Sequence, residues 1–197
     1  EGMSDRFMAT YKRPFEAKDI KVVMYAGGLH ERYGLKKLTE AFMMLPQENF
    51  RLKLFGSGPF VEKLKTKYTK KDSRIQYMGV APNAEVVAAE LDASLLVNPR
   101  PTHEEFTKYS FPSKNIEYMA SGTPLLTTKL PGMPKEYYPY VFLIENESVE
   151  GYAKALESVL AQSDEELYVF GEKAKDFVLE KKNSFEQAKR VIELIKL

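Results

Sequence analysis

Short apolar runs alternate with helical segments along almost the whole chain, and this alternation is the strongest constraint on the fold. Six runs have the length of a strand that is buried on both faces: 20–26, 50–55, 74–78, 93–98, 124–128 and 141–144. Strands that are separated by helices pair in parallel, because each crossover helix packs back onto the sheet. The sequence therefore predicts an α/β fold with a Rossmann-like, doubly wound parallel sheet of about six strands.

Loops that follow predicted strands carry the glycines and polar residues from which a ligand site could be built. Four such loops occur, at 27–34, 56–58, 79–82 and 99–113. Ligands of doubly wound sheets bind outside the carboxyl ends of the strands. We therefore expect these four loops to form a single crevice.

The segment 109–124 contains the most specific pattern. Pro112 suits the first turn of a helix and Gly122 suits its end. Three residues at helical spacing form an apolar stripe: Ile116, Met119 and Ala120. Ser113, Glu117 and Ser121 follow at four-residue steps, which predicts a polar flank. A carboxylate at Glu117 could accept hydrogen bonds from two sugar hydroxyls, although an isolated glutamate is more often a solvated helix residue.

Residues 111–126 resemble the donor-binding motif of GT-B glycosyltransferases, most closely the retaining family 4. Their sequence is FPSKNIEYMASGTPLL. In that family a Glu-x7-Glu pair binds the nucleotide sugar, and its second Glu holds the ribose. Glu117 matches the second Glu, whereas the first position holds Tyr109. The resemblance implies a donor site that contains Tyr109, Ser110, Phe111, Pro112, Ser113, Lys114 and Glu117.

The same resemblance implies a role for the glycine loops. Members of the family place the donor diphosphate beside the loop after the first strand, here Gly27 and Gly28. Relatives often carry a phosphate-binding Arg and Lys where this chain has Gly28 and Tyr33. Arg32 and Lys36 are therefore our candidates for binding the phosphates. Gly58 in the second loop and Val80, expected near the base, complete the implied donor site. Glu117 and Arg32 are the residues that we expect to position the donor.

Arg100 follows the fourth predicted strand and leaves two interpretations open. Its guanidinium could reach a phosphate, or it could pair with Glu104 or Glu105.

Taken as a whole, the resemblance implies a donor-binding C-terminal domain. We expect residues 1–19 to be an interdomain linker and residues 20–197 to bind the nucleotide sugar, with the N-terminal acceptor domain absent from this chain. The expected reaction is retaining transfer from a nucleoside-diphosphate sugar, a UDP sugar favoured, to a glycan or lipid-linked acceptor. Surface polysaccharide synthesis is the expected context, and the isolated domain is expected to be inactive.

Composition limits the other functions. The net charge of +1 gives no electrostatic reason to expect nucleic-acid binding. The resemblance implies no cofactor and no essential metal, and the absence of an Asp-x-Asp signature agrees with this. The absence of cysteine excludes Cys-ligated zinc. No apolar run approaches the ~20 residues of a membrane span, and no signal peptide is present. We expect a cytoplasmic location, with peripheral contact at the inner face of the membrane as an open alternative.

Two alternatives remain. Tyr109 and Gly28, at positions where relatives often carry Glu and Arg, favour a non-catalytic sugar-nucleotide-binding or partner subunit. A nicotinamide-binding domain is disfavoured because the glycines do not form G-x-G-x-x-G.

Overall fold

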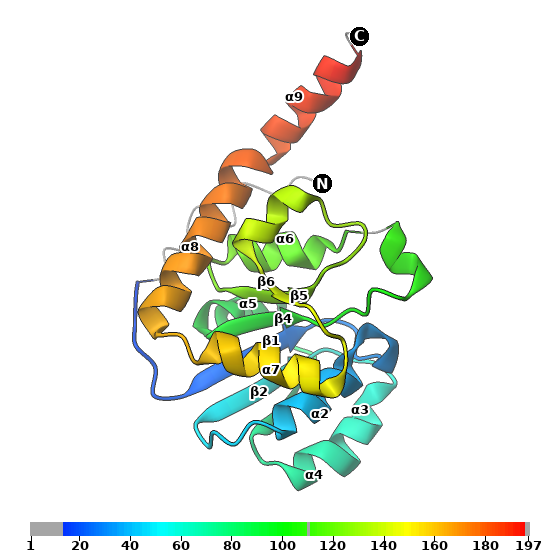
Figure 1. The fold of residues 1–197 in the computed structure, drawn as a ribbon, viewed down its shortest axis with the longest axis vertical. Coiled ribbons are helices and arrows are strands. Elements are labelled where there is room, and N and C mark those ends of the chain that lie inside the picture. The colour runs from blue at the N-terminus through cyan, green and yellow to red at the C-terminus, as the bar shows by residue number, and fades with distance from the viewer. Residues whose placement is uncertain (1–13, 110, 196–197) are drawn as a thin grey trace.

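A sheet of six parallel strands forms the centre of the computed structural model, which describes residues 14–109 and 111–195 (Figure 1). The strands are β1 (Lys21–Ala26), β2 (Phe50–Phe55), β3 (Ile75–Gly79), β4 (Leu95–Asn98), β5 (Leu125–Thr128) and β6 (Phe142–Ile144). Their order across the sheet is β3-β2-β1-β4-β5-β6, and every pairing is parallel. The predicted doubly wound sheet is confirmed.

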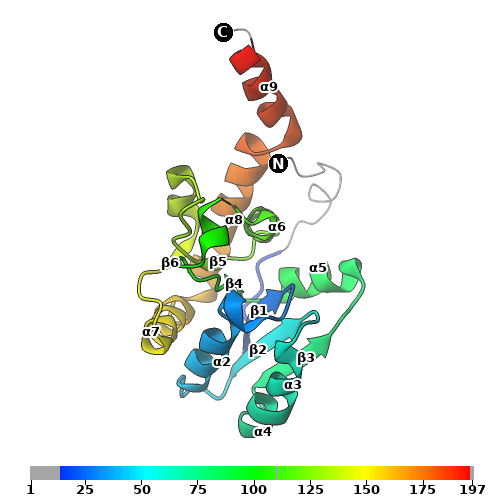
Figure 2. The same cartoon turned by 90° about the vertical axis from the view of Figure 1, so that its right-hand side faces the viewer.

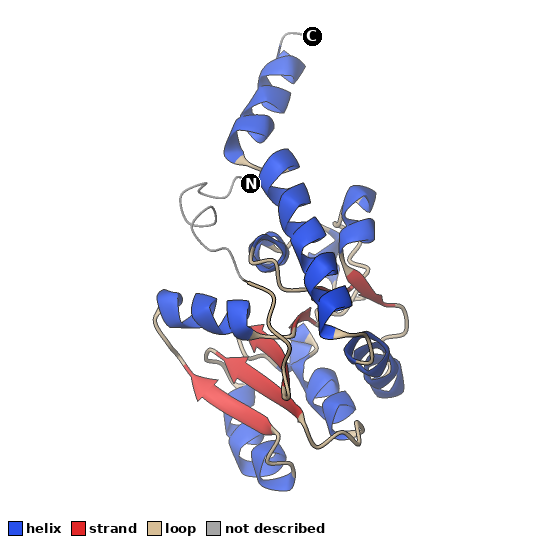
Figure 3. Ribbon diagram, turned by 90° about the vertical axis from the view of Figure 1, so that its left-hand side faces the viewer, coloured by secondary structure: helices blue, strands red, loops and turns tan. Residues whose placement is uncertain are grey.

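Helices link the strands and cover both faces of the sheet (Figures 2 and 3). They are α2 (Leu35–Met43), α3 (Phe60–Lys63), α4 (Thr69–Lys71), α5 (Asn83–Asp92), α6 (Ser113–Ala120), α7 (Val149–Leu160), α8 (Asp164–Lys181) and α9 (Ser184–Ile195). A π-helical turn, Leu64–Tyr68, joins α3 to α4. Helices α2, α3 and α7 lie on one face, whereas α5, α6 and α8 lie on the other.

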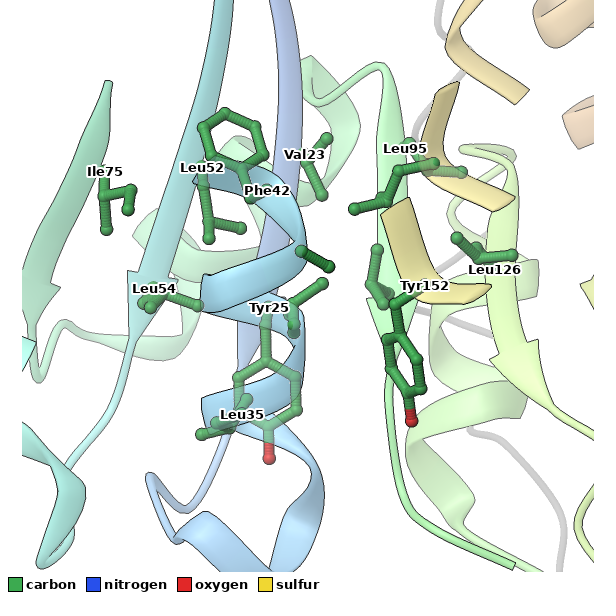
Figure 4. Close-up of a cluster of buried hydrophobic side chains, with 14 of the residues drawn as sticks. Val23, Tyr25, Leu35, Phe42, Leu52, Leu54, Ile75, Leu95, Leu126 and Tyr152 are labelled. Carbon is green, nitrogen blue, oxygen red and sulfur yellow. The ribbon is translucent and has the colours of Figure 1, made fainter. Parts of the chain in front are cut away.

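The first hydrophobic layer lies beneath α2, α3 and α7. Alternate residues of the strands, such as Val23, Leu52 and Leu95, meet Phe42 of α2 and Tyr152 of α7 there (Figure 4). Successive strand side chains point to opposite faces, so the neighbouring strand residues enter the second layer instead. A chain of this sequence therefore buries both faces of its central strands.

The second layer lies beneath α5, α6 and α8. Met24 of β1 and Leu96 of β4 pack there against the fully buried Met119 of α6. The stripe predicted for 112–122 thus faces the sheet as expected. This packing fixes the side of α6 that remains available to a ligand.

The order in which successive strands are added to the sheet reverses between β1 and β4. From β1 the order runs outward through β2 and β3 on one side, and through β4, β5 and β6 on the other. The loops after β1 and β4 therefore lead to helices on opposite faces, and the point between them is where doubly wound sheets bind ligands.

The residues that precede β1 lie along the domain. Residues 14–20 have no regular structure, and the backbone N–H of Lys18 donates to Asp164 at the start of α8 (2.8 Å). The ring of Phe15 meets that of Tyr168 edge-on, at 5.6 Å. The rest of the predicted linker, residues 1–13, lies outside the described residues.

The last helix extends away from the body of the domain (Figures 1 and 3). Among the described residues, no helix combines the length and the apolar character that crossing a membrane requires.

Candidate donor-binding site

Helix α6 is attached to the end of β1 by a buried tyrosine. The Tyr118 hydroxyl accepts a hydrogen bond from the Ala26 N–H (2.8 Å) and donates one to the Ala26 carbonyl (3.2 Å). Complete burial raises the pKa of Tyr118, so the phenol keeps the proton that it donates. Because Ala26 directly precedes Gly27, this contact places α6 beside the first glycine loop.

The start of α6 is held by a second buried polar contact. Asn98, at the end of β4, donates from its side-chain amide to the side-chain oxygen of Asn115 (2.5 Å). Thr127 of β5 donates to the Asn98 carbonyl (3.1 Å). The first turn of α6 is therefore registered against two neighbouring strands, which fixes the residues on its exposed flank.

The ends of α6 differ in part from the expectation. Gly122 has φ 78°, the left-handed conformation predicted for it. Pro112 is buried but lies one position before the helix with extended backbone (ψ 122°), so its prediction as a first-turn residue is wrong. Ser121 does not continue a polar flank, because its hydroxyl is buried and donates to the Tyr118 carbonyl (2.6 Å). The exposed part of the flank ends at Glu117.

Glu117 and Lys114 form an ion pair on that flank. The Lys114 ammonium lies 2.9 Å from a carboxylate oxygen of Glu117, and the two side chains are 29% and 32% exposed. The pair is thus accessible to a ligand. A carboxylate held this way presents acceptors to a ligand diol, and the ammonium can donate to an anion.

Two guanidinium groups flank one aromatic ring at the mouth of the first loop. The guanidinium of Arg32 lies 5.2 Å from the centre of the Tyr33 ring, and that of Arg100 lies 5.0 Å from it. Arg100 also lies 5.9 Å from the ring of Phe106. Across 14–109 and 111–195, neither arginine forms an ion pair, so the predicted partners Glu104 and Glu105 do not pair with Arg100. Positive charge that no protein carboxylate neutralises favours an anionic ligand.

Two buried tyrosines connect the first hydrophobic layer to this mouth. The Tyr25 hydroxyl donates to the Gly28 carbonyl (3.1 Å), and that of Tyr152 donates to the Pro99 carbonyl (2.8 Å). Figure 4 shows both rings pointing the same way, toward the carboxyl ends of the strands. Burial raises the pKa of Tyr25 to about 12, so this hydroxyl also remains a donor at neutral pH. The loops after β1 and β4 are thereby anchored to one core.

The glycine loops after β1 and β2 pack directly on one another. Leu29 N–H donates to the Ser57 carbonyl (2.8 Å), and a Cβ on Gly58 would lie 2.3 Å from the carbonyl oxygen of Leu29. The Gly56 N–H in turn donates to the Gly79 carbonyl (2.7 Å), which joins the third loop to the second. Three of the four predicted loops therefore lie side by side. Close backbone approach explains Gly58, whereas Gly28 is exposed.

The remaining predicted residues lie around these loops. Val80 follows β3 and is 76% exposed, and Tyr109 is 85% exposed. Phe111 is half-buried, with its ring 4.7 Å from that of Tyr137. Lys36 is half-buried in the first turn of α2, and Ser113 is exposed at the start of α6. Ser110 lies outside the described residues.

One acidic residue near Glu117 was not predicted from the sequence. Glu90 of α5 is 1% exposed, and its carboxyl lies 4.0 Å from the Lys114 ammonium. The sequence around Glu90 has the pattern of an ordinary amphipathic helix. Nothing in that pattern indicates that this glutamate is buried. In residues 14–109 and 111–195, no three His, Asp or Glu side chains gather as metal ligands would.

The family model for glycosyl transferases group 1 matches residues 9–177. The chain belongs to this family. Over 129 residues it is 29% identical to the colanic acid biosynthesis glycosyltransferase WcaL of Escherichia coli K12. That match covers 62% of this chain and 32% of WcaL, so the chain spans about a third of this curated relative.

Solved structures confirm the GT-B type of fold. The C-terminal domain of LpcC, a group 1 family protein from Francisella tularensis, superimposes with a TM-score of 0.68 at 19% identity. The match covers 84% of this chain and 87% of the LpcC domain. Anabaena HepE, solved in complex with UDP and glucose, gives a TM-score of 0.72 at 15% identity over 90% of this chain and 48% of HepE.

Proposed function

We propose that this chain is the donor-binding half of a retaining glycosyltransferase that uses a nucleoside-diphosphate sugar, a UDP sugar favoured. The observation that carries the proposal is the placement of Glu117 and Arg100. Glu117 lies on the helix after β4, and Arg100 lies on the loop after the same strand, beside the loop after β1. A carboxylate that can accept hydrogen bonds from a diol, and a cation that can bind phosphate, thus lie near the point where the strand order reverses.

Each part of the donor has a matching group. The ribose hydroxyls would donate to Glu117, and the diphosphate would lie against Gly27, Gly28 and the guanidiniums of Arg32 and Arg100. Arginine suits this role because its donors form a rigid fork that matches phosphate oxygens. The base would meet the exposed Val80 loop.

The chemistry that this arrangement supports is stabilisation of a leaving diphosphate. Sugar transfer separates charge between the sugar and the diphosphate, and fixed cations lower the barrier when they meet that developing charge. Arg32 and Arg100 would supply the positive charge without a metal ion, so we propose a metal-independent reaction. HepE, solved with UDP and glucose, shares this fold and is consistent with such a donor.

The acceptor and the location are part of the same proposal. WcaL, a colanic acid biosynthesis enzyme, supports a glycan or lipid-linked acceptor in surface polysaccharide synthesis. A second, N-terminal domain would bring that acceptor to the crevice. For such synthesis the protein would act in the cytoplasm, in peripheral contact with the inner face of the membrane and without nucleic acid.

Calorimetry with UDP, GDP and ADP, each with a chelator present, tests the binding step. We expect UDP to bind weakly, near the millimolar range and about −4 kcal/mol. Glu117→Ala removes charge-assisted hydrogen bonds of about 1.5–3 kcal/mol and should weaken binding roughly ten- to hundredfold. Glu157→Ala, an exposed helical glutamate of α7, is the control. Equal affinities in both variants would remove the role of Glu117.

A transfer assay tests whether this chain provides only the donor-binding half of the active site. Positioning both reactants contributes up to about 7–11 kcal/mol in ideal cases, and this chain would supply only the donor side. We expect residues 1–197 alone to transfer no sugar to any acceptor. Measurable transfer by this chain alone would show that the acceptor site is present here.

The second candidate is a non-catalytic sugar-nucleotide-binding subunit. It is favoured by Tyr109, which is 85% exposed and carries no charge where the family pattern has a carboxylate. A protein that joins this chain to its acceptor domain, binds a UDP sugar and still transfers nothing would favour this candidate over the enzyme.

A further inference from the structure

The ammonium of Lys114 lies between two carboxyl groups that come from different helices. It is 2.9 Å from Glu117 of α6 and 4.0 Å from Glu90 of α5. The first distance is within hydrogen-bond length, and the second is beyond it. Lys114 therefore has one occupied partner and one that is available.

The available partner, Glu90, is almost completely buried. Glu90 is 1% exposed, and in the described part of the chain its Oε1 atom has no hydrogen-bond partner. An unpaired carboxylate in such a place is costly, so the group takes up a proton more readily than a solvated one. Burial raises the pKa of Glu90 to about 7, with Lys114 acting in the opposite direction.

The charged and titratable groups that face Glu90 are few. Helix α6 contributes Lys114, Glu117 and the phenol of Tyr118. On α8, beyond Gly122, Lys175 and Glu172 form an ion pair of their own (3.7 Å). Lys114 is thus the cation that is in position to compensate an ionised Glu90.

A ligand on Glu117 would share this carboxylate with Lys114. The proposed function requires the ribose hydroxyls to donate to the same carboxylate that Lys114 now holds. Each donor that the ligand adds weakens the hold of Glu117 on the ammonium, because one carboxylate then serves more donors.

We propose that Glu90 is a positioning residue that receives Lys114 when a nucleotide sugar binds to Glu117. Before binding, the ammonium pairs with Glu117 and the Glu90 carboxyl carries a proton. After binding, Glu117 accepts from the ribose, the ammonium pairs with ionised Glu90, and the Glu90 proton goes to solvent. The inference rests on the proposed function, because the ligand drives the exchange.

Proton release makes the affinity depend on pH in a defined direction. A ligand that binds the deprotonated form more tightly gains affinity as the pH rises through the pKa of the free protein. With a pKa of about 7 for Glu90, we expect affinity to rise about tenfold between about pH 6 and about pH 8.

Calorimetry with UDP-glucose in buffers of different ionisation enthalpy measures the released protons. UDP-glucose is the correct probe, because the terminal phosphate of UDP itself titrates near pH ~6, whereas the diphosphate diester has no such group. We expect proton release near neutral pH in the unmodified chain and none in Glu90→Gln. The matched control, Glu85→Gln, changes an exposed carboxylate of the same helix and should release protons as the unmodified chain does.

The outcomes separate the two proposals. A chain that binds UDP-glucose with no proton release, or with the same release in Glu90→Gln, refutes the exchange and leaves the proposed function standing. A chain that binds no nucleotide sugar refutes both.

A ligand-free measurement tests the exchange itself. The Glu90 carboxyl carbon is titrated by NMR in the unmodified chain, in Glu117→Gln, in Lys114→Met and in the double variant. Removing the competing Glu117 should lower the pKa of Glu90 more when Lys114 is present than when it is methionine, because only then can the ammonium move. An equal decrease in both backgrounds would show a direct charge effect and would overturn the exchange.

Discussion

The hydroxyl of Tyr118 satisfies both backbone groups of Ala26, accepting from its N–H at 2.8 Å and donating to its carbonyl at 3.2 Å. One side chain of α6 thereby takes the place of a neighbouring strand at the last residue of β1. Glu117 precedes this tyrosine and Gly27 follows this alanine. The distance between the proposed ribose contact and the proposed phosphate loop is therefore set by a single buried phenol.

Removing that phenol should loosen the site and weaken the fold. Tyr118→Phe leaves two backbone groups of Ala26 buried without their partner, at about 1–3 kcal/mol for each unsatisfied group. We expect a lower urea midpoint and a weaker affinity for UDP. Tyr138→Phe is the control, because no hydrogen bond of its hydroxyl occurs among the described residues. Equal unfolding midpoints in the two variants would show that water replaces the phenol at Ala26.

The glycine that opens α2 should tolerate no side chain. Gly34 has φ 83°, and a Cβ there would lie 1.8 Å from the Pro99 carbonyl oxygen. Gly34→Ala should therefore lower the free energy of unfolding by about 1–3 kcal/mol from backbone strain, with the clash adding to it. In Gly28→Ala the new Cβ would meet only the His30 and Tyr33 side chains at 3.3 Å, and we expect a much smaller loss. Chemical denaturation of both variants measures the difference.

The regular elements could be predicted because their signals are local. The sequence predicted β2 at its observed bounds, where apolar and basic residues alternate, and β5 within one residue, where all four residues are buried. Gly122 was predicted correctly for the same kind of reason, since a left-handed residue at a helix end favours glycine.

The contacts that complete the site could not be predicted because they join residues far apart in sequence. Ser121 looked like part of a polar flank, but the helix turns it inward to the Tyr118 carbonyl. Glu90 lies 24 residues before Lys114 in the numbering of the chain, and only the packing of α5 beside α6 brings them together. Arg100 had two possible roles, and in the described residues it lies beside the rings of Tyr33 and Phe106 and forms no ion pair with Glu104 or Glu105.

Glu90 should make the stability of the free protein fall as the pH rises. Its pKa is raised from 4.5 to about 7 on folding, so between these values the native state binds more protons than the unfolded state. The slope of unfolding free energy against pH is then negative. The stabilisation is complete below about pH 4.5 and lost as the pH passes about 7, for a total of about 3 kcal/mol.

Denaturation of the unmodified chain and of Glu90→Gln across this range isolates the effect. The glutamine imitates the protonated carboxyl, so the difference in stability between the two proteins should grow in favour of Glu90→Gln as the pH rises. Asp72 cannot cause such a trend, because its hydrogen bond to the Arg74 side chain lowers its pKa and acts at acidic pH. Parallel curves for the two proteins would contradict a raised pKa at Glu90.

The guanidiniums beside Tyr33 should recognise phosphate rather than nucleoside. Arg100→Gln removes a cation that the described residues leave without a carboxylate partner, and charge-assisted hydrogen bonds contribute about 1.5–3 kcal/mol each. We expect UDP affinity to fall roughly ten- to hundredfold in Arg100→Gln. Uridine affinity should not change, because uridine has no phosphate to contact. Arg32→Gln should show the same selectivity with a smaller loss, since Arg32 is the more exposed of the two.

A matched control separates loss of a contact from loss of structure in this experiment. Arg51 donates to the carbonyls of Glu48 and Phe50 at the opposite end of the sheet, so Arg51→Gln removes the same charge from the protein without touching the crevice. If Arg51→Gln weakens UDP binding as much as Arg100→Gln does, the effect is one of overall charge. If Arg100→Gln weakens uridine and UDP equally, its guanidinium orders the Tyr33 loop instead of holding phosphate. Only a loss confined to Arg32 and Arg100, and confined to the phosphorylated ligand, places the diphosphate between the loops after β1 and β4.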